Sequence, residues 1–146
     1  MFRLPSVTRQ NSETREAALA LLDGVGLKGS ADVSAGSLSY GACKRLEIAR
    51  ALAAEPRVLL LDEPAAGCNA VETEEIDELI RRVAAKGIAI VLVEHDMKLV
   101  MKISDHILVL NRGKPIAEGK PREVRDNPAV LEAYLGKHGA KEAARA

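Results

Sequence analysis

Two adjacent carboxylates follow a short apolar stretch near the middle of this sequence. Residues 58–61 are Val-Leu-Leu-Leu, and Asp62, Glu63 and Pro64 come directly after them. A buried strand with this ending carries both carboxylates to the edge of a sheet where open α/β folds bind ligands. There an aspartate can hold Mg²⁺ through water, and a glutamate can orient or deprotonate the water that attacks a terminal phosphate. A solvated acidic turn explains the same residues, so this stretch alone leaves both interpretations open.

Two further groups lie at spacings that favour the chemical interpretation. Ser39 and Gly41 precede Asp62 by just over twenty residues, and His95 follows Glu63 by about thirty. A serine hydroxyl, a glycine and a helix N-terminus together suit a phosphate, although ordinary helix capping uses the same residues. An isolated histidine at a strand end is more often bonded to nearby backbone. The presence of all three groups in one chain favours nucleotide chemistry over coincidence.

Four predicted helices must position these groups, and the first and third show a helical apolar period. Ser12 is placed to cap the first helix. In the third, Val71 is expected on the apolar face, and Glu72, Glu74 and Glu75 are interpreted as a solvated charged face. The predicted helices span residues 12–27, 41–54, 71–85 and 97–103.

Short apolar runs between the helices predict strands. Residues 58–62 and 88–93 are uniformly apolar, so we expect both strands to be buried on both faces. The helix between them requires a parallel pair. A third strand over 106–111 is expected to pair with 115–119 as a hairpin, because Asn-Arg-Gly-Lys is a turn signal.

Bulk composition excludes several classes of partner. The 146 residues carry 21 basic and 21 acidic side chains, which leaves no positive field for nucleic acid or anionic lipid. The longest apolar run, 88–93, is far shorter than the roughly 20 residues of a membrane-spanning helix, so no direct membrane insertion is expected. Cys43 and Cys68 have no metal-ligand spacing and are expected as free thiols. The N-terminus has no signal-peptide pattern, which favours a cytoplasmic location.

Taken together, these groups resemble the ATP-binding subunit of an ABC transporter. The resemblance implies Mg-ATP as cofactor, with a signature motif that contacts ATP held by the opposite subunit and therefore works in trans. Carried over residue by residue, the resemblance assigns nucleotide contact in trans to the signature residues Leu38, Ser39, Tyr40 and Gly41. It assigns Mg²⁺ binding through water to Asp62 and the D-loop position to Asn69. Catalysis is assigned to Glu63 and to His95, which would sense the γ-phosphate.

Three stretches point within that family to branched-chain amino acid importers: residues 62–69, 94–101 and 119–136. The last also resembles ATPases of urea importers and of lipopolysaccharide export. The resemblance implies transmembrane permease subunits and a second ATP-binding subunit as partners. It also implies a cytoplasmic location, peripheral to the inner membrane.

No G-x-x-x-x-G-K-[ST] loop occurs in the sequence, so nothing obvious cradles the phosphates. We therefore expect a truncated ATP-binding subunit, inactive alone, that would couple ATP hydrolysis to transport if a P-loop were supplied. A binding or regulatory module that offers its signature in trans to a complete ABC ATPase is the alternative, and a fragment left by gene rearrangement is a third. Uncovered sheet surface predicts aggregation or a homodimer.

The resemblance implies an α/β fold, a partial P-loop NTPase-like and mostly parallel sheet with a small helical subdomain, lacking the N-terminal strands and the P-loop. Residues 1–54 are expected to form a partial helical subdomain that ends in the signature motif and its helix. Residues 55–119 are expected to form a partial α/β ATPase core. The tail, 120–146, is predicted as two short helices divided at Asn127-Pro128, followed by ten frayed residues.

Overall fold

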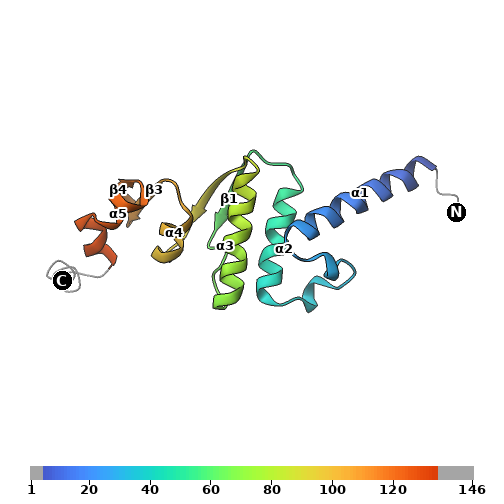
Figure 1. The fold of residues 1–146 in the computed structure, drawn as a ribbon, viewed down its shortest axis with the longest axis horizontal. Helices are drawn as coiled ribbons and strands as arrows, with labels where there is room; N and C mark the ends of the chain where they lie inside the picture. Colours follow the sequence, from blue (N-terminus) through green and yellow to red (C-terminus); the bar gives the residue numbers. More distant parts are fainter. Residues whose placement is uncertain (1–4, 135–146) are drawn as a thin grey trace. The chain divides into compact units, whose positions relative to one another are not determined.

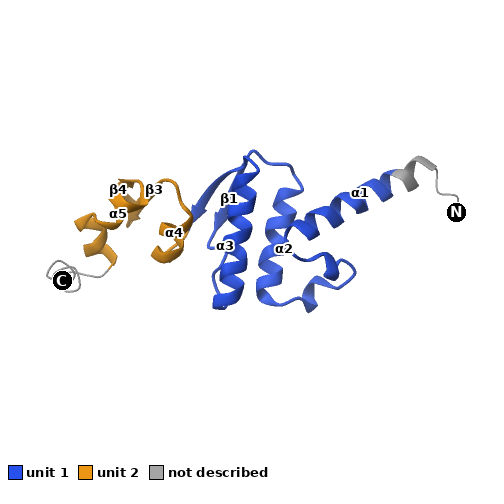
Figure 2. Cartoon of the chain, viewed as in Figure 1, with its two compact units in different colours: residues 1–93 blue, residues 94–146 orange. Residues whose placement is uncertain are grey.

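The computed structural model describes residues 5–134, with the side chains of residues 10–134. The chain forms two compact units, Met1–Val93 and Glu94–Ala146, which Figure 2 draws in blue and orange. The predicted subdivision near residues 54 and 119 stays a prediction, and the ten C-terminal residues expected to fray lie outside the described range.

Helices make up most of the first unit (Figure 1). The prediction that Ser12 caps the first helix is wrong, because that helix already begins at Pro5, a residue type favoured in the first helical turn. Ser12 instead lies inside the helix, where its hydroxyl contacts Oε1 of Glu16 at 3.5 Å. The elements are α1 (Pro5–Gly24), the 3₁₀ turns η1 (Lys28–Ser30) and η2 (Ala35–Ser37), α2 (Tyr40–Leu52) and α3 (Ala70–Ala85).

The predicted parallel strand pair is confirmed. Strand β1 (Val58–Asp62) pairs in parallel with β2 (Ala89–Val93), and α3 connects them. Burial on both faces was a wrong expectation, however. Leu59 is 5% exposed whereas Leu60 is 73% exposed, and β2 has no fully buried residue. Within the described residues, the alternating side chains of β1 are therefore covered on one face only.

Helix α3 supplies much of the core of this unit. Its residues Ile76, Leu79, Ile80 and Val83 are at most 5% exposed, as predicted. The prediction for Val71 is wrong, since Val71 is 70% exposed. Residues four apart share a helix face, so the row that contains Ile76 continues through residue 72 rather than through residue 71.

The second unit contains a hairpin and short helices, as predicted. Strands β3 (Ile107–Asn111) and β4 (Lys114–Gly119) pair antiparallel, with an irregularity between Val109 and Leu110. Helix α4 (Met97–Ile103) precedes the hairpin, α5 (Pro121–Arg125) follows it, and residues 128–134 are again helical. The core is formed by Ile107, Val124 and Val130. Over residues 5–134, no helix has both the length and the apolar character needed to cross a membrane.

Candidate functional site

Strand β1 delivers two acidic residues to its carboxyl end. Asp62 pairs with Val93 at the end of β2, and the amide of Glu63 donates to the Val93 carbonyl at 2.9 Å. Glu63 has a φ of 44°, in the left-handed region that non-glycine residues rarely adopt, and Pro64, which follows, is buried. Such outliers cost about 1–3 kcal/mol and cluster at functional sites. The backbone therefore turns sharply between two exposed acidic residues, Asp62 and Glu63.

These carboxylates fit one kind of metal site. Among residues 5–134, no three carboxylate, imidazole or thiolate side chains gather closely enough to hold a metal ion by themselves. Mg²⁺ in nucleotide sites keeps several waters and is commonly bound through one or two carboxylates together with substrate phosphates. Asp62 at the end of β1 fits that arrangement, because most of the ligands would come from nucleotide and water.

The predicted signature residues surround the N-terminus of α2. Leu38 is extended, with φ −76° and ψ 153°, and leads into Ser39, the N-cap residue. The Ser39 hydroxyl accepts a hydrogen bond from the amide of Ala42 at 3.2 Å. Tyr40 is 55% exposed, whereas Gly41 is buried. Ser39 is therefore a true helix cap, and capping alone accounts for its bond to Ala42.

The predicted D-loop residue, Asn69, begins a different helix. Its Oδ1 accepts from the amides of Val71 at 2.9 Å and Glu72 at 3.0 Å. In return, Oε2 of Glu72 accepts from the Asn69 amide at 3.2 Å, which completes a capping box at the N-terminus of α3. Asparagine caps a helix as well as aspartate does, so this local structure needs no acid at position 69.

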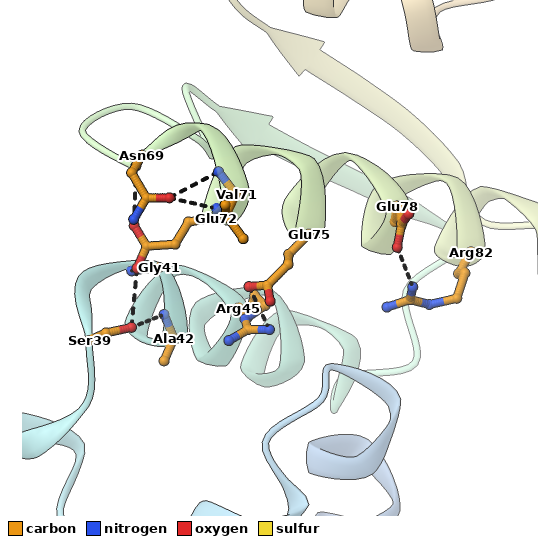
Figure 3. Close-up of polar contacts among 10 residues, drawn as sticks. All are labelled: Ser39, Gly41, Ala42, Arg45, Asn69, Val71, Glu72, Glu75, Glu78 and Arg82. Carbon is orange, nitrogen blue, oxygen red and sulfur yellow. Dashed lines mark hydrogen bonds and ion pairs between the residues drawn. The ribbon is translucent and has the colours of Figure 1, made fainter.

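Glu72 joins the two helix N-termini. Its Oε1 accepts from the Ser39 hydroxyl and from the Gly41 amide, each at 3.2 Å (Figure 3). The interpretation of Glu72 as solvated surface was wrong, because its partly buried carboxylate accepts hydrogen bonds at the N-termini of both helices. The available signal was the spacing of Asn69 and Glu72, which is typical of a capping box.

Hydrogen bonds to Glu72 favour the ionised form of its carboxylate. The Asn69 amide, followed by the Gly41 amide and the Ser39 hydroxyl, lowers the pKa of Glu72 below its ordinary value of 4.5, while desolvation opposes them. One turn further along α3, Glu75 forms an ion pair of 3.0 Å with Arg45 of α2. The Glu75 side chain is still 44% exposed, so its interpretation as solvated surface omitted the ion pair, and Glu74 is exposed as expected.

The loop between β1 and α3 also approaches the signature residues. Gly67 has a φ of 79°, and a Cβ built on it would lie 3.1 Å from the Tyr40 ring. Cys68 follows in the same loop as a free thiol. Burial, and next the charge of Glu72, raise the pKa of the Cys68 thiol above its ordinary value of 9.0, against the opposing effect of Lys44. The thiol is therefore protonated at neutral pH.

His95 belongs to the second unit. Its amide donates to Oε2 of Glu94 at 3.2 Å, and its Nδ1 lies 3.9 Å from the same oxygen. The His95 side chain is 76% exposed and that of Glu94 is 4% exposed. Asp96 then caps α4 by accepting from the Lys98 amide at 2.8 Å. The structure thus brings Ser39, Gly41 and Asn69 together around Glu72, and the role of His95 stays a prediction.

Two family models match separate parts of the chain. The one described as ABC transporter matches residues 2–66, which include the signature residues and the end of β1. The one described as branched-chain amino acid ATP-binding cassette transporter matches residues 114–140.

Curated proteins and solved structures give the same result. The chain is 49% identical to the high-affinity branched-chain amino acid transport ATP-binding protein BraF of Pseudomonas aeruginosa, over 93% of this chain and 54% of BraF. It is 48% identical to LivG of Escherichia coli, which has the same description, over the same shares. A solved ATP-binding cassette of an ABC transporter, in its ADP conformation, matches with 35% identity and a TM-score of 0.76, over 84% of this chain and 50% of that one. The chain therefore spans about half the length of the proteins it matches.

Proposed function

Because this chain belongs to the family of ABC transporter ATP-binding proteins, we propose that it forms the signature and Walker B part of a branched-chain amino acid importer's ATPase. Its 146 residues contain no G-x-x-x-x-G-K-[ST] loop. The phosphates of ATP must therefore be held by a P-loop outside this sequence. In this proposal the chain completes a nucleotide site and binds no ATP productively by itself.

The observation that carries the proposal is the meeting of two helix N-termini. Ser39 caps α2, Asn69 caps α3, and both caps contact the same carboxylate of Glu72. Helix N-termini favour anions because their first amides have no partner within the helix and the helix dipole is positive there. Residues far apart in the sequence, to which we assign the signature and D-loop positions, are thus adjacent in the fold.

Asp62 and Glu63 would serve the hydrolytic step. Asp62 would hold Mg²⁺ through water, which neutralises charge on the phosphates and orients them. Glu63, directly after it, would orient the attacking water and accept its proton, a contribution typically worth about 10²–10⁴ in rate. A sharp turn at Glu63, with its φ of 44°, directs the chain away from β1 at the position that needs a carboxylate beyond the sheet edge.

The remaining assigned residues would contact the nucleotide and take no part in proton transfer. The Ser39 side chain and the Gly41 backbone would contact phosphate held by the opposite subunit, with Leu38 and Tyr40 shaping that loop. His95 would contact the terminal phosphate. In this structure the Ser39 hydroxyl donates its single proton to Glu72, so a phosphate at Ser39 must share that proton.

The proposed partners follow from the same assignment. BraF and LivG are described as transport ATP-binding proteins. We assign this chain to an assembly of transmembrane permease subunits and a second ATP-binding subunit, peripheral to the inner membrane. No nucleic acid takes part.

The test measures nucleotide binding and association in one experiment. Calorimetric titration of the purified chain with Mg-ATP is expected to show no binding up to millimolar concentration. A complete ATP-binding subunit of a branched-chain amino acid importer, with its own catalytic glutamate replaced by glutamine, should bind the chain only when ATP is present. Ser39→Ala should weaken that association by about tenfold or more, the effect of one hydrogen bond to a charged group.

Two results would contradict the proposal. Micromolar binding of ATP by the chain alone, lost in Asp62→Asn, would mean that these residues form a complete nucleotide site. ATP hydrolysis by the chain alone, abolished by Glu63→Gln, would lead to the same conclusion.

The absence of a P-loop motif from the 146 residues also supports a second function, a regulatory module that acts on a complete ABC ATPase. Addition of the chain to an active complete subunit separates the two. A chain that completes the nucleotide site raises hydrolysis by the complete subunit, and Ser39→Ala removes the increase. A regulatory module that acts elsewhere changes hydrolysis equally with serine or alanine at position 39.

A further inference from the structure

We propose that Glu72 is a positioning residue that couples the signature loop, residues 38–41, to the D-loop, residues 66–69. This proposal rests on the proposed function for the roles of the two loops, and on geometry alone for the coupling between them. Glu72 itself is assigned no contact with nucleotide.

The two oxygens of Glu72 divide their partners between the loops. Oε1 accepts from the Ser39 hydroxyl and the Gly41 amide, each at 3.2 Å. Oε2 accepts from the Asn69 amide at 3.2 Å. Because both oxygens belong to one rigid, planar group, movement of either loop changes the geometry of the hydrogen bonds to the other loop.

Close packing accompanies these hydrogen bonds. A Cβ built on Gly41 would lie 2.6 Å from Cγ and Cδ of Glu72, so glycine permits the close approach. Asn69 fixes the Glu72 backbone in turn, since its Oδ1 accepts from the Glu72 amide at 3.0 Å. The Tyr40 ring lies against Gly67, which gives a second contact between the same two loops.

Glu75 makes a contact between α2 and α3 that does not involve the two loops. Its ion pair with Arg45, at 3.0 Å, also joins α3 to α2, but it lies one turn away from both loops (Figure 3). A variant at Glu75 therefore removes a carboxylate that bridges the helices and leaves the loop contacts in place. It is the matched control for Glu72.

The coupling is tested on the whole chain without nucleotide, by NMR of backbone amides. Asn69→Ala is expected to shift the Gly41 amide resonance and to speed its hydrogen exchange at least tenfold. In a Glu72→Ala background, Asn69→Ala should leave Gly41 unchanged. Compared with Glu72→Ala, Glu72→Gln keeps an acceptor oxygen toward the Gly41 amide and should restore most of its protection from hydrogen exchange. Glu75→Ala should resemble the wild type.

A pH titration adds a readout that loss of packing alone would not move. The Gly41 and Asn69 amide resonances should titrate together, with one midpoint below 4.5, and neither should titrate in Glu72→Gln. Separate midpoints, or an Asn69→Ala effect on Gly41 that persists without Glu72, would overturn the coupling.

The functional part of the test measures association of the chain with the complete ATP-binding subunit. If the wild-type chain associates in the presence of ATP, Glu72→Ala should weaken association at least tenfold and Glu75→Ala less than twofold. Unchanged or stronger association of Glu72→Ala would overturn the positioning role, the latter because Glu72 would then compete with phosphate. If the wild-type chain does not associate, the proposed function fails, while the amide measurements still decide the coupling.

Discussion

The Gly41 amide donates to Oε1 of Glu72 at 3.2 Å, and no side chain fits between the two residues. A Cβ at position 41 would lie 2.6 Å from the Glu72 side chain. Glycine at position 41 therefore permits the close approach of Glu72, and a larger residue there would displace the Glu72 side chain.

Replacement of Gly41 by alanine should force the Glu72 carboxylate away from the loop. Alanine has a helix propensity about 1 kcal/mol more favourable than that of glycine. This gain should offset much of the lost contact with Glu72, so overall stability should change little. The Asn69 amide resonance should nevertheless shift, because Glu72 also accepts from Asn69. Gly24→Ala is the control, since a Cβ there would have no neighbour within 4 Å. An unchanged Asn69 resonance in Gly41→Ala would contradict the prediction.

Acid should destabilise the first unit through Glu72. Its pKa is lowered in the folded chain, so ionised Glu72 contributes stability that is present above pH 4.5 and is lost as pH falls through the folded-state pKa. The midpoint temperature of thermal unfolding should therefore fall more steeply below pH 4.5 in the wild type than in Glu72→Gln. The two curves should differ most at neutral pH and converge once the pH falls below the folded-state pKa of Glu72. Parallel curves over the whole range would contradict the prediction.

Cys68 should react slowly with alkylating reagents at neutral pH. Its pKa lies above 9.0, chiefly because of burial and next because of the negative charge of Glu72. Since the thiolate is the nucleophile, the rate with iodoacetamide should rise steeply above pH 9. Glu72→Gln should move that rise to lower pH. The measurement is made in Cys43→Ser, and fast alkylation at pH 7 would contradict it.

The core of α3 should separate buried from exposed apolar positions. Leu79 is 1% exposed, so Leu79→Ala should lower the free energy of unfolding by about 2–5 kcal/mol. Val71, at 70% exposed, should tolerate alanine within about 0.5 kcal/mol. Denaturant unfolding measures both. Similar losses at the two positions would show that Val71 is buried in solution.

The uncovered face of the β1–β2 sheet should cause self-association. Leu60 is 73% exposed, and Val91, its partner across the sheet, is 52% exposed. Sedimentation should show association that increases with protein concentration and is reduced at least tenfold in Leu60→Lys. Val33, 49% exposed outside this sheet, supplies the control Val33→Lys. A wild-type chain that stays monomeric at 100 times the lowest concentration tested would contradict the prediction.

The sequence by itself determined most of the local structure, because the relevant signals lie within a few residues of one another. Helix α4 and strand β1 have the predicted bounds or nearly so, and Asn111 to Lys114 form the expected turn. The pairing of β1 with β2 also followed from the order of strand, helix and strand. Helix α1 was misplaced, since it spans Pro5–Gly24 instead of residues 12–27, and Ser12 and Pro5 are both acceptable at a helix start.

Only the tertiary structure decided which surfaces are covered and which charged residues matter. Uniformly apolar β1 predicted burial of both faces, but burial depends on what packs against the sheet, and Leu60 is exposed. Glu72, Glu74 and Glu75 are alike in sequence and differ in structure because the helix period turns them toward different neighbours. Glu72 meets Ser39 and Gly41 only because α2 and α3 pack together, a contact between residues more than thirty positions apart.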